Sequence, residues 1–334
     1  MKTSRRLFQM LSVVCALVVM GISAMAADPG LIFPPTSEVN DQKAGSVLVY
    51  NYYTSSSSAP NLTNTRFNLT NTSSTSAAFV HLFFVEGSSC SVSDRFVCLT
   101  ANQTLTFLAS EQDPTTTGFL VAIAANGVNG CPAAFNFLIG DEYVKTDSLH
   151  RANLGAEAFA ALYNGQLPGC DGNSVTAVLS FDGVVGSGYN RVPRVLAVSS
   201  IPSILDGNNT RLIVNRIGGT LVTSSSSVGS VFGLLYDDQE EPHSWNANWG
   251  CQVVVQLTNN FPKVAPRFDQ VIPAGQTGWM KFWATSDVGI VGAVINQNAS
   301  VGTAAGAFVG GHNLHKLTLS ASNSWTIPIF PPSC

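Results

Sequence analysis

Two stretches of this chain, residues 118–140 and 289–311, match each other without a gap, and this internal repetition constrains the fold more than any other feature. The matched positions are Gly118, Ala122, Ala133, Ala134, Phe137 and Gly140 in the first stretch and Gly289, Ala293, Ala304, Ala305, Phe308 and Gly311 in the second. A repeat of this kind predicts tandem β modules. The shared residues pack and turn but carry no acid–base or ligand chemistry, so the repeat predicts an architecture and not a reaction.

Upstream of these stretches, two alternative registers of the repeat are open. Residues 64–67 (NTRF) resemble residues 209–212 (NTRL), which would leave an insertion in the second copy. Alternatively, residues 67–71 (FNLTN) resemble residues 255–259 (VQLTN), which would make the second copy shorter. The two alternatives exclude each other, because each assigns a different partner to the same strand.

Short runs rich in Val, Ile, Phe, Tyr and Thr recur along the chain between Ser, Asn, Gly and Pro clusters, and they predict β-strands. They cover residues 47–53, 65–71, 78–85, 104–109, 119–125, 134–139, 194–199, 211–216, 231–236, 252–258, 280–284 and 290–296, with a further run from residue 175. Alternation in residues 279–283 (WMKFW) places the two Trp side chains on one face of a strand and Met280 and Phe282 on the other. Residues 154–163, rich in Ala, Leu and Glu, instead predict a short helix.

Together these patterns predict an all-β fold of two tandem Ig-like antiparallel β-sandwich domains with one short helix between or beside them. The expected divisions are a signal peptide at 1–26, an extended leader at 27–45, a first β-sandwich domain at 46–170 and a second at 171–334. A chain of 334 residues is long enough to give each domain its own core.

Residues 1–26 have the features of an export signal. Basic residues within 2–6 precede an apolar run at 7–22, and residues 24–26 (AMA) fit the small-x-small cleavage pattern. Residues 4–8 (SRRLF) also resemble the twin-arginine motif, but the strong apolarity of the run and the cysteines downstream favour the general secretory route. With no second apolar span, we expect a secreted or cell-surface protein, periplasmic or extracellular, without a transmembrane anchor.

The even number of cysteines after the signal predicts disulfides, for which fifteen connectivities exist. The candidates are Cys90, Cys98, Cys131, Cys170, Cys251 and Cys334. Closeness in sequence favours Cys90–Cys98, and turn-like surroundings favour Cys131–Cys170, which leaves Cys251–Cys334. No C-x-x-C or zinc-type spacing occurs.

Charge and motifs exclude several classes of function. Only 11% of the residues are charged, the net charge is −4 and no basic cluster occurs, so nucleic-acid binding is not expected. No G-x-S-x-G, S-x-x-K or phosphate-binding glycine loop is present. We therefore expect no catalytic residue, no metal, no cofactor and no enzymatic activity. A secreted hydrolase is the alternative, and it would require acids to converge in a cleft.

The densest charge and two of the tryptophans fall in the same segment, residues 237–249. Its candidate ligand-binding residues are Asp237, Asp238, Glu240, Glu241, Trp245 and Trp249. Exposed tryptophans beside acids and amides would suit sugar stacking, although buried tryptophans closing the end of a sandwich are the competing interpretation. The acidic run lacks the spacing of an EF-hand calcium loop, which favours a solvated loop.

The segments LTNTSSTSAAFVHLFFVEG and LTANQTLTFLAS resemble those of bacterial exported Ig-like sandwiches of the CARDB type. The resemblance covers residues 46–141 and, more weakly, 209–311, and it rests on turn chemistry. It implies an adhesion or spacer role without a defined site.

We therefore expect an exported non-enzymatic structural or interaction protein at the cell surface or in the extracellular matrix. The alternative is a carbohydrate-binding module using the 237–249 loop. Expected partners are a protein or a glycan at the cell surface, with self-association through edge strands as a further route.

Overall fold

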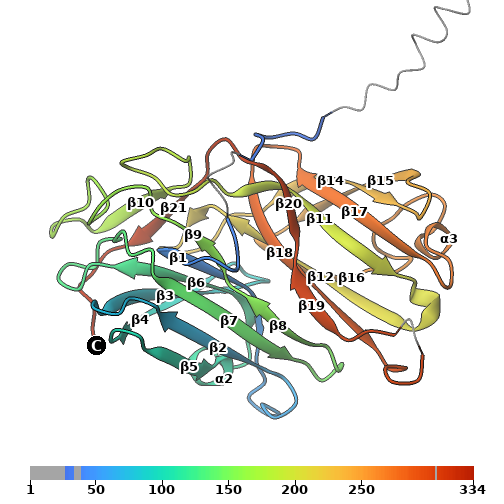
Figure 1. Ribbon diagram of the computed structural model, residues 1–334, viewed down its shortest axis with the longest axis horizontal. Helices are drawn as coiled ribbons and strands as arrows, with labels where there is room; N and C mark the ends of the chain where they lie inside the picture. The colour runs from blue at the N-terminus through green and yellow to red at the C-terminus, as the bar shows by residue number, and fades with distance from the viewer. Residues whose placement is uncertain (1–26, 34–38, 305–306) are drawn as a thin grey trace, which may run out of the picture.

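A computed structural model describes residues 27–33, 39–304 and 307–334 (Figure 1). The signal peptide predicted at 1–26, part of the predicted leader and Ala305 of the repeat lie outside the described residues. Strands account for 52% of the chain and helices for 4%, which confirms the all-β class.

The strands form five small sheets, here numbered in the order in which their faces pack. Sheet I contains β10 (Thr176–Ser180), β21 (Ser324–Pro328) and β13 (Gly219–Thr220). Sheet II contains, in spatial order, β4 (Val92–Leu99), β3 (Ala78–Glu86), β6 (Thr117–Ala125), β1 (Val47–Thr54) and β9 (Glu157–Phe159). Sheet III contains β5 (Thr104–Leu108), β2 (Asn64–Asn71), β7 (Leu138–Lys145) and β8 (Arg151–Gly155).

The other two sheets come from the second half of the chain. Sheet IV contains β16 (Gln252–Gln256), β12 (Asn208–Ile217), β18 (Gly289–Asn298) and β19 (Gly310–Asn313). Sheet V contains β15 (Pro242–Trp249), β14 (Gly229–Tyr236), β17 (Thr277–Ala284), β11 (Pro193–Pro202) and β20 (His315–Leu319). The described helices are single turns: α2 (Ala109–Gln112), α3 (Phe268–Val271) and the 3-10 turn η1 (Ile204–Asp206).

The topology of sheets II and III recurs in sheets V and IV. Strands β1 to β9 occupy the same places, in the same order, as β11, β12, β14, β15, β16, β17, β18, β19 and β20. In addition, α2 precedes β6 just as α3 precedes β17. The chain therefore repeats one topology, and sheet I is the part that has no counterpart.

The register of that repeat differs from the match between residues 118–140 and 289–311. The match aligns β6 with β18, whereas the structural counterpart of β6 is β17. Of the two upstream alternatives, the topology selects the NTRF/NTRL pair, because these residues lie in β2 and β12. Gly, Ala and Phe recur wherever β-strands pack closely, so they do not define a register.

The prediction of two tandem Ig-like sandwiches is wrong. In an Ig-like domain the first two strands share a sheet, whereas β1 and β2 lie in different sheets here, as do β11 and β12. The five small sheets are instead arranged like the blades of a five-bladed β-propeller. Their faces pack in succession, so a strand such as β1 is buried along its whole length and not on one side only.

Four apolar clusters fill the spaces between successive sheets. One cluster joins sheet I to sheet II and draws Val291 of β18 into it. A second lies between sheets II and III, and a third between sheets IV and V. The fourth joins sheets III and IV through Val144, Ala152, Leu154, Ile213, Ala293 and Ile295, with Tyr52 of sheet II beside them. The two halves of the chain therefore bury apolar surface against each other.

The helix predicted at 154–163 is also wrong. This segment contains the end of β8 and the whole of β9, and β9 extends sheet II by pairing with β1. All three residues of β9 are buried. Packing of both strands into sheets overrides the weak helical preference of Ala, Leu and Glu.

A buried seam of amide side chains links the two halves. Asn215 Nδ2 donates to the Asn51 carbonyl oxygen at 2.8 Å, and Gln252 Nε2 donates to Asn215 Oδ1 at 2.8 Å. Asn51 Nδ2 donates to Asn313 Oδ1 at 2.9 Å. Asn51 and Asn215 are fully buried, so these bonds are formed away from water. Asn51 and Asn215 each bond a group of the opposite half, and Gln252 Nε2 also reaches the Asn51 carbonyl oxygen at 3.4 Å.

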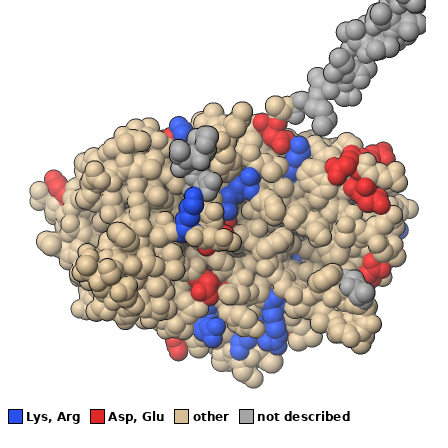
Figure 2. Space-filling model, viewed as in Figure 1, with Lys and Arg blue, Asp and Glu red and all other residues tan. Residues whose placement is uncertain are grey.

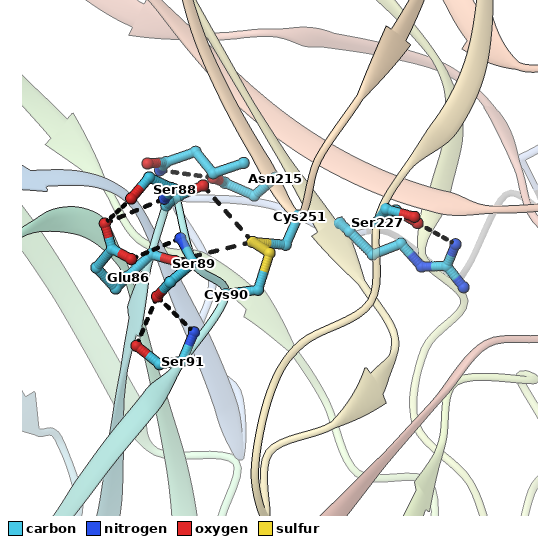
Figure 3. Close-up of a disulfide and its surroundings, with 11 residues drawn as sticks. Glu86, Ser88, Ser89, Cys90, Ser91, Asn215, Ser227 and Cys251 are labelled. Atoms are coloured by element: carbon cyan, nitrogen blue, oxygen red, sulfur yellow. Dashed lines mark hydrogen bonds between the residues drawn. A yellow bond between two sulfur atoms is a disulfide. The ribbon is translucent and has the colours of Figure 1, made fainter.

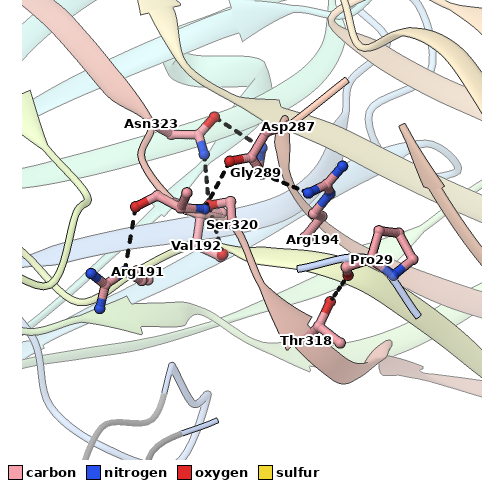
Figure 4. A network of polar contacts seen from close by, with 10 residues as sticks. Pro29, Arg191, Val192, Arg194, Asp287, Gly289, Thr318, Ser320 and Asn323 are labelled. Atoms are coloured by element: carbon pink, nitrogen blue, oxygen red, sulfur yellow. Dashed lines mark hydrogen bonds and ion pairs between the residues drawn. The ribbon is translucent and has the colours of Figure 1, made fainter. Parts of the chain in front are cut away.

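Both ends of the described chain are tied to the sheets. Thr318 Oγ1 donates to the Pro29 carbonyl oxygen at 2.6 Å, and Leu31 forms a bridge with Leu319 at the edge of sheet V. Nearby, Asn323 bonds the Gly289 amide and Ser320, while Arg194 pairs with Asp287 at 3.4 Å (Figure 4). The segment that precedes β1 therefore lies against the last strands of the second half.

Two of the three predicted disulfides are wrong. The pairs are Cys90–Cys251, drawn in Figure 3, Cys98–Cys334 and Cys131–Cys170, of which only the last was predicted. Cys90 and Cys98 flank or lie in β4, whose extended backbone separates them by about 26 Å. A disulfide requires Cα atoms within about 7 Å. The observed pair Cys90–Cys251, with Cα atoms 5.9 Å apart, instead joins the two halves.

Loss of the disulfide between the halves is expected to cost more stability than loss of the local one. Chain-entropy arguments give about 5 kcal/mol for Cys90–Cys251, with its sequence separation of 161, and about 4 kcal/mol for Cys131–Cys170, with its separation of 39. Denaturant unfolding of the Cys90→Ser/Cys251→Ser and Cys131→Ser/Cys170→Ser double variants measures both. A smaller loss in the first variant would contradict the assigned connectivity.

Breaking the amide seam is expected to destabilise the protein strongly. Asn51→Ala leaves buried partners in the other half without hydrogen bonds and should lower the free energy of unfolding by about 2–4 kcal/mol. Asn246→Ala, on an exposed position of β15, is the matched control and should change it by less than about 0.5 kcal/mol. Equal effects in the two variants would show that the seam does not hold the halves together.

Candidate functional site

The acidic residues predicted as a ligand loop form the tip of the β14–β15 hairpin. Asp237 Oδ1 accepts hydrogen bonds from the backbone N–H groups of Gln239 at 2.9 Å and Glu241 at 2.8 Å, which shapes the turn. Glu240 has a positive φ of 65° and accepts a hydrogen bond from Trp279 Nε1 at 3.0 Å. Asp238, Glu240 and Glu241 are exposed. Figure 2 shows acidic side chains gathered at this end of the molecule.

The sugar-stacking hypothesis requires Trp245 and Trp249 to be exposed, but both side chains are buried. Residues 242–249 form strand β15 and not a loop, and both indole rings point into the core between sheets IV and V. Their exposed fractions are 3% and 5%, and both rings pack against Phe282. Gly233 on β14 makes room for the Trp245 ring, because a Cβ at that position would collide with it. The two tryptophans are therefore core residues.

Three side chains at the hairpin tip could together hold a metal ion. Ligand atoms of Asp237, Glu241 and His243 lie within 4.8 Å of one another. Calcium prefers six to eight oxygen ligands, so three such groups would have to be completed by water. The arrangement thus offers at most a weak, open site.

Sheet V has an outer face, opposite the face on which Trp245 and Trp249 are buried. On β14 and β17 this outer face carries an unusual set of apolar side chains, which we call the aromatic face. Residues paired across neighbouring strands point to the same side of a sheet. The pairs Phe232–Trp283, Leu234–Lys281 and Tyr236–Trp279 therefore project outward from β14 and β17. Each of these side chains is partly exposed. Solvent faces of antiparallel sheets are normally polar, so this face departs from the usual pattern.

The aromatic rings of this face meet in two pairs. Tyr236 and Trp279 are stacked, with ring centroids 4.1 Å apart and an interplanar angle of 4°. Phe232 and Trp283 lie 5.2 Å apart at 55°. Lys281 lies between the two pairs, with its ammonium 6.0 Å from the Tyr236 ring. The result is a largely apolar row that is unbroken on β14 and interrupted on β17 by Lys281.

A row of neutral polar side chains on β15 borders the aromatic face. Ser244, Asn246 and Asn248 are paired with Leu234, Phe232 and Ser230, so they point to the same side as the rings. All three are exposed. Within the described part of the chain, no residue forms a side-chain hydrogen bond with Ser244, Asn246 or Asn248. Their hydroxyl and amide groups are available to a ligand.

Sequence reasoning identified Trp279 and Trp283 as sharing one face but did not place that face outside, and it did not single out Phe232 or Tyr236. In residues 231–236 both faces of the strand are apolar, so alternation could not distinguish inside from outside. The available signal was Gly233. A glycine between larger residues in a strand marks a close approach, and here it identifies the inner face.

The buried titratable groups are packed into the structure and do not surround a cleft. His81 contacts Asp94 at 2.6 Å and is stacked on Phe96, and burial lowers its pKa. Glu142 accepts a hydrogen bond from the Tyr52 amide at 2.9 Å, and burial raises its pKa well above the usual range. Glu157 pairs with Lys316 at 2.7 Å, and burial raises its pKa to about 7.

The histidine pair His312 and His315 lies on strands β19 and β20. Both side chains are exposed, and their ring centroids are 6.0 Å apart. Burial of part of the ring lowers the pKa of His312. His312 also lines a surface cavity of about 400 Å³ beside Phe308 and Asn296.

No known protein family, curated protein or solved structure matches this chain. Among the described residues, no helix has both the length and the apolar character needed to cross a membrane. A β-propeller fold is commonly a non-enzymatic protein-interaction scaffold.

The raised pKa values of the buried acids predict that stability falls as the pH rises. An acid whose pKa is higher in the folded state binds more protons there, so its contribution is complete below pH 4.5 and is lost as the pH rises through about 7. The shift of Glu157 alone corresponds to roughly 3 kcal/mol. Replacing Glu142 by Gln removes one of these two groups and should flatten the decline.

Denaturant unfolding between pH 4.5 and pH 7.5 measures this effect on the wild type and on Glu142→Gln. Asp238→Asn at the exposed hairpin tip serves as the control and should keep the wild-type slope. An unchanged slope in Glu142→Gln would show that the Glu142 carboxyl does not take up a proton on folding.

Proposed function

We propose that this protein is an exported, non-enzymatic recognition scaffold that acts at the cell surface or in the extracellular matrix. The observation that carries the proposal is the aromatic face of sheet V. Exposed apolar patches with a polar border mark binding sites on otherwise polar proteins. The rings stand on paired strands of a packed sheet, so they are held in place before any partner arrives.

The disulfides support an exported location. Three pairs form in the described structure, and such bonds persist in oxidising compartments outside the cytosol. Two of them join segments far apart in sequence. A scaffold closed in this way resists unfolding when it is exposed to a variable environment.

The buried acids support a role without catalysis. Glu142 and Glu157 lie at the junctions between sheets, where each bonds groups of the scaffold itself. A catalytic acid or base must reach a bound substrate. Both carboxyl groups are fully buried, so a substrate in solution does not reach them.

The glycan alternative, in its original form, used the 237–249 segment. Burial of both tryptophans removes their rings from any ligand, so only the acidic members of the predicted ligand set remain accessible. A carbohydrate site on this protein would therefore use other residues. Self-association through an edge strand is a separate route, for which β15 is the exposed edge of sheet V.

Surface retention of the protein on expressing cells tests the proposal. We expect the wild type to be labelled by a non-permeant reagent, to contain no free thiol and to remain on intact cells after washing. Trp279→Ser/Trp283→Ser should reduce the retained fraction several-fold. Tyr143→Ser, which removes an exposed ring on sheet III, is the matched control. Reduced cysteines inside the cell, or equal retention of all variants, would refute the proposal.

A further inference from the structure

We infer that the aromatic face binds a neutral polysaccharide, and this inference rests on the proposed function. The polymer would lie along β14 and β17, with its sugar rings against the aromatic side chains and its hydroxyl groups directed to the Ser and Asn row of β15. The sequence alone does not assign such a site to these residues.

The apolar part of the face has the extent needed for a polymer. Trp279 and Trp283 are four residues apart on β17, which corresponds to about 13 Å along the strand. Their partners Tyr236 and Phe232 repeat that spacing on β14. A row of this length contacts more than one sugar ring. The apolar C–H faces of pyranose rings pack against aromatic side chains, which is the contact that this row offers.

The polar border of the face matches hydroxyl groups and not charges. Ser244, Asn246 and Asn248 stand at every second residue of β15, about 7 Å apart. An amide both donates and accepts hydrogen bonds, and so does a hydroxyl. A sugar hydroxyl also has both capacities. The three side chains have no protein hydrogen-bond partner in the described structure, so a ligand would replace only their bonds to water.

Charge on and around the face selects a neutral ligand. The ammonium of Lys281, the cation of the face, is already paired with Asp28 at 2.7 Å. Acidic side chains gather at the hairpin tip, beside Trp279 (Figure 2). An anionic polysaccharide would meet repulsion there without a free cation to compensate. A neutral polymer meets no such penalty.

Affinity electrophoresis of the full chain, with its disulfides formed, tests this inference. Neutral polysaccharides in the gel (hydroxyethyl cellulose, galactomannan and dextran) are compared with anionic alginate. We expect at least one neutral polymer to retard the wild type and alginate to have no effect. Trp279→Ser and Trp283→Ser should each weaken binding about tenfold, and Asn246→Ala about threefold.

Controls separate a binding defect from a folding defect. Asn246→Ala changes an exposed side chain outside the core, so it should unfold like the wild type. Tyr143→Ser removes a ring from a different sheet and should keep full affinity. Retardation by no neutral polymer, or equal retardation of all variants, would overturn the inference. Stronger retardation by alginate would overturn it as well.

Two further outcomes distinguish this inference from the proposed function. If Trp279→Ser/Trp283→Ser loses surface retention while no polysaccharide binds the wild type, the scaffold role stands and the glycan ligand is wrong. Light scattering after gel filtration tests whether a second copy of the chain occupies the aromatic face instead. A wild-type dimer that becomes monomeric in Trp283→Ser would assign the face to a second copy of the chain and overturn the glycan assignment.

Discussion

The buried amide seam between the two halves is the interaction on which the rest of the structure depends. Asn51 and Asn215 are excluded from water and satisfy each other across the junction, with Gln252 beside them. Buried polar groups are costly when unpaired, so neither half can present this surface alone. The Cys90–Cys251 disulfide then closes the same junction covalently. Two copies of one topology thus become a single packed unit instead of two independent modules.

Successive packing of the sheets explains where a recognition surface can lie. Sheets II, III and IV each contribute to apolar clusters with two other sheets, so most of their apolar side chains are used internally. Sheet V lies at one end of this succession and packs against sheet IV alone among the apolar clusters. No sheet covers its outer face, where residues 28–31 lie against β20 and Lys281 and the aromatic side chains stay partly exposed. The position of the candidate site follows from the order of packing.

Much of the fold could be predicted from local pattern, and the site could not. Alternating and β-branched runs located β1, β2, β3, β6, β11, β12, β14, β17 and β18 within a few residues. Strand β15 was missed because its Asn, Ser and His residues are typical of a loop. Its two tryptophans nevertheless lie on the buried face of the strand. Short strands such as β9 follow from pairing with distant partners, which propensity does not report.

By itself, the sequence determined the all-β class, the short strands and the even set of cysteines, because strand periodicity and disulfide chemistry depend on residue type and local order. Only the tertiary structure decided which sheets face each other, which cysteines pair and which tryptophans are exposed. Those features depend on contacts between residues far apart in the chain. Trp245 and Trp279 show the difference: both lie on strands of sheet V, but one faces sheet IV and the other is partly exposed on the outer face. A strand has two faces, and the chain alone does not say which of them will be covered.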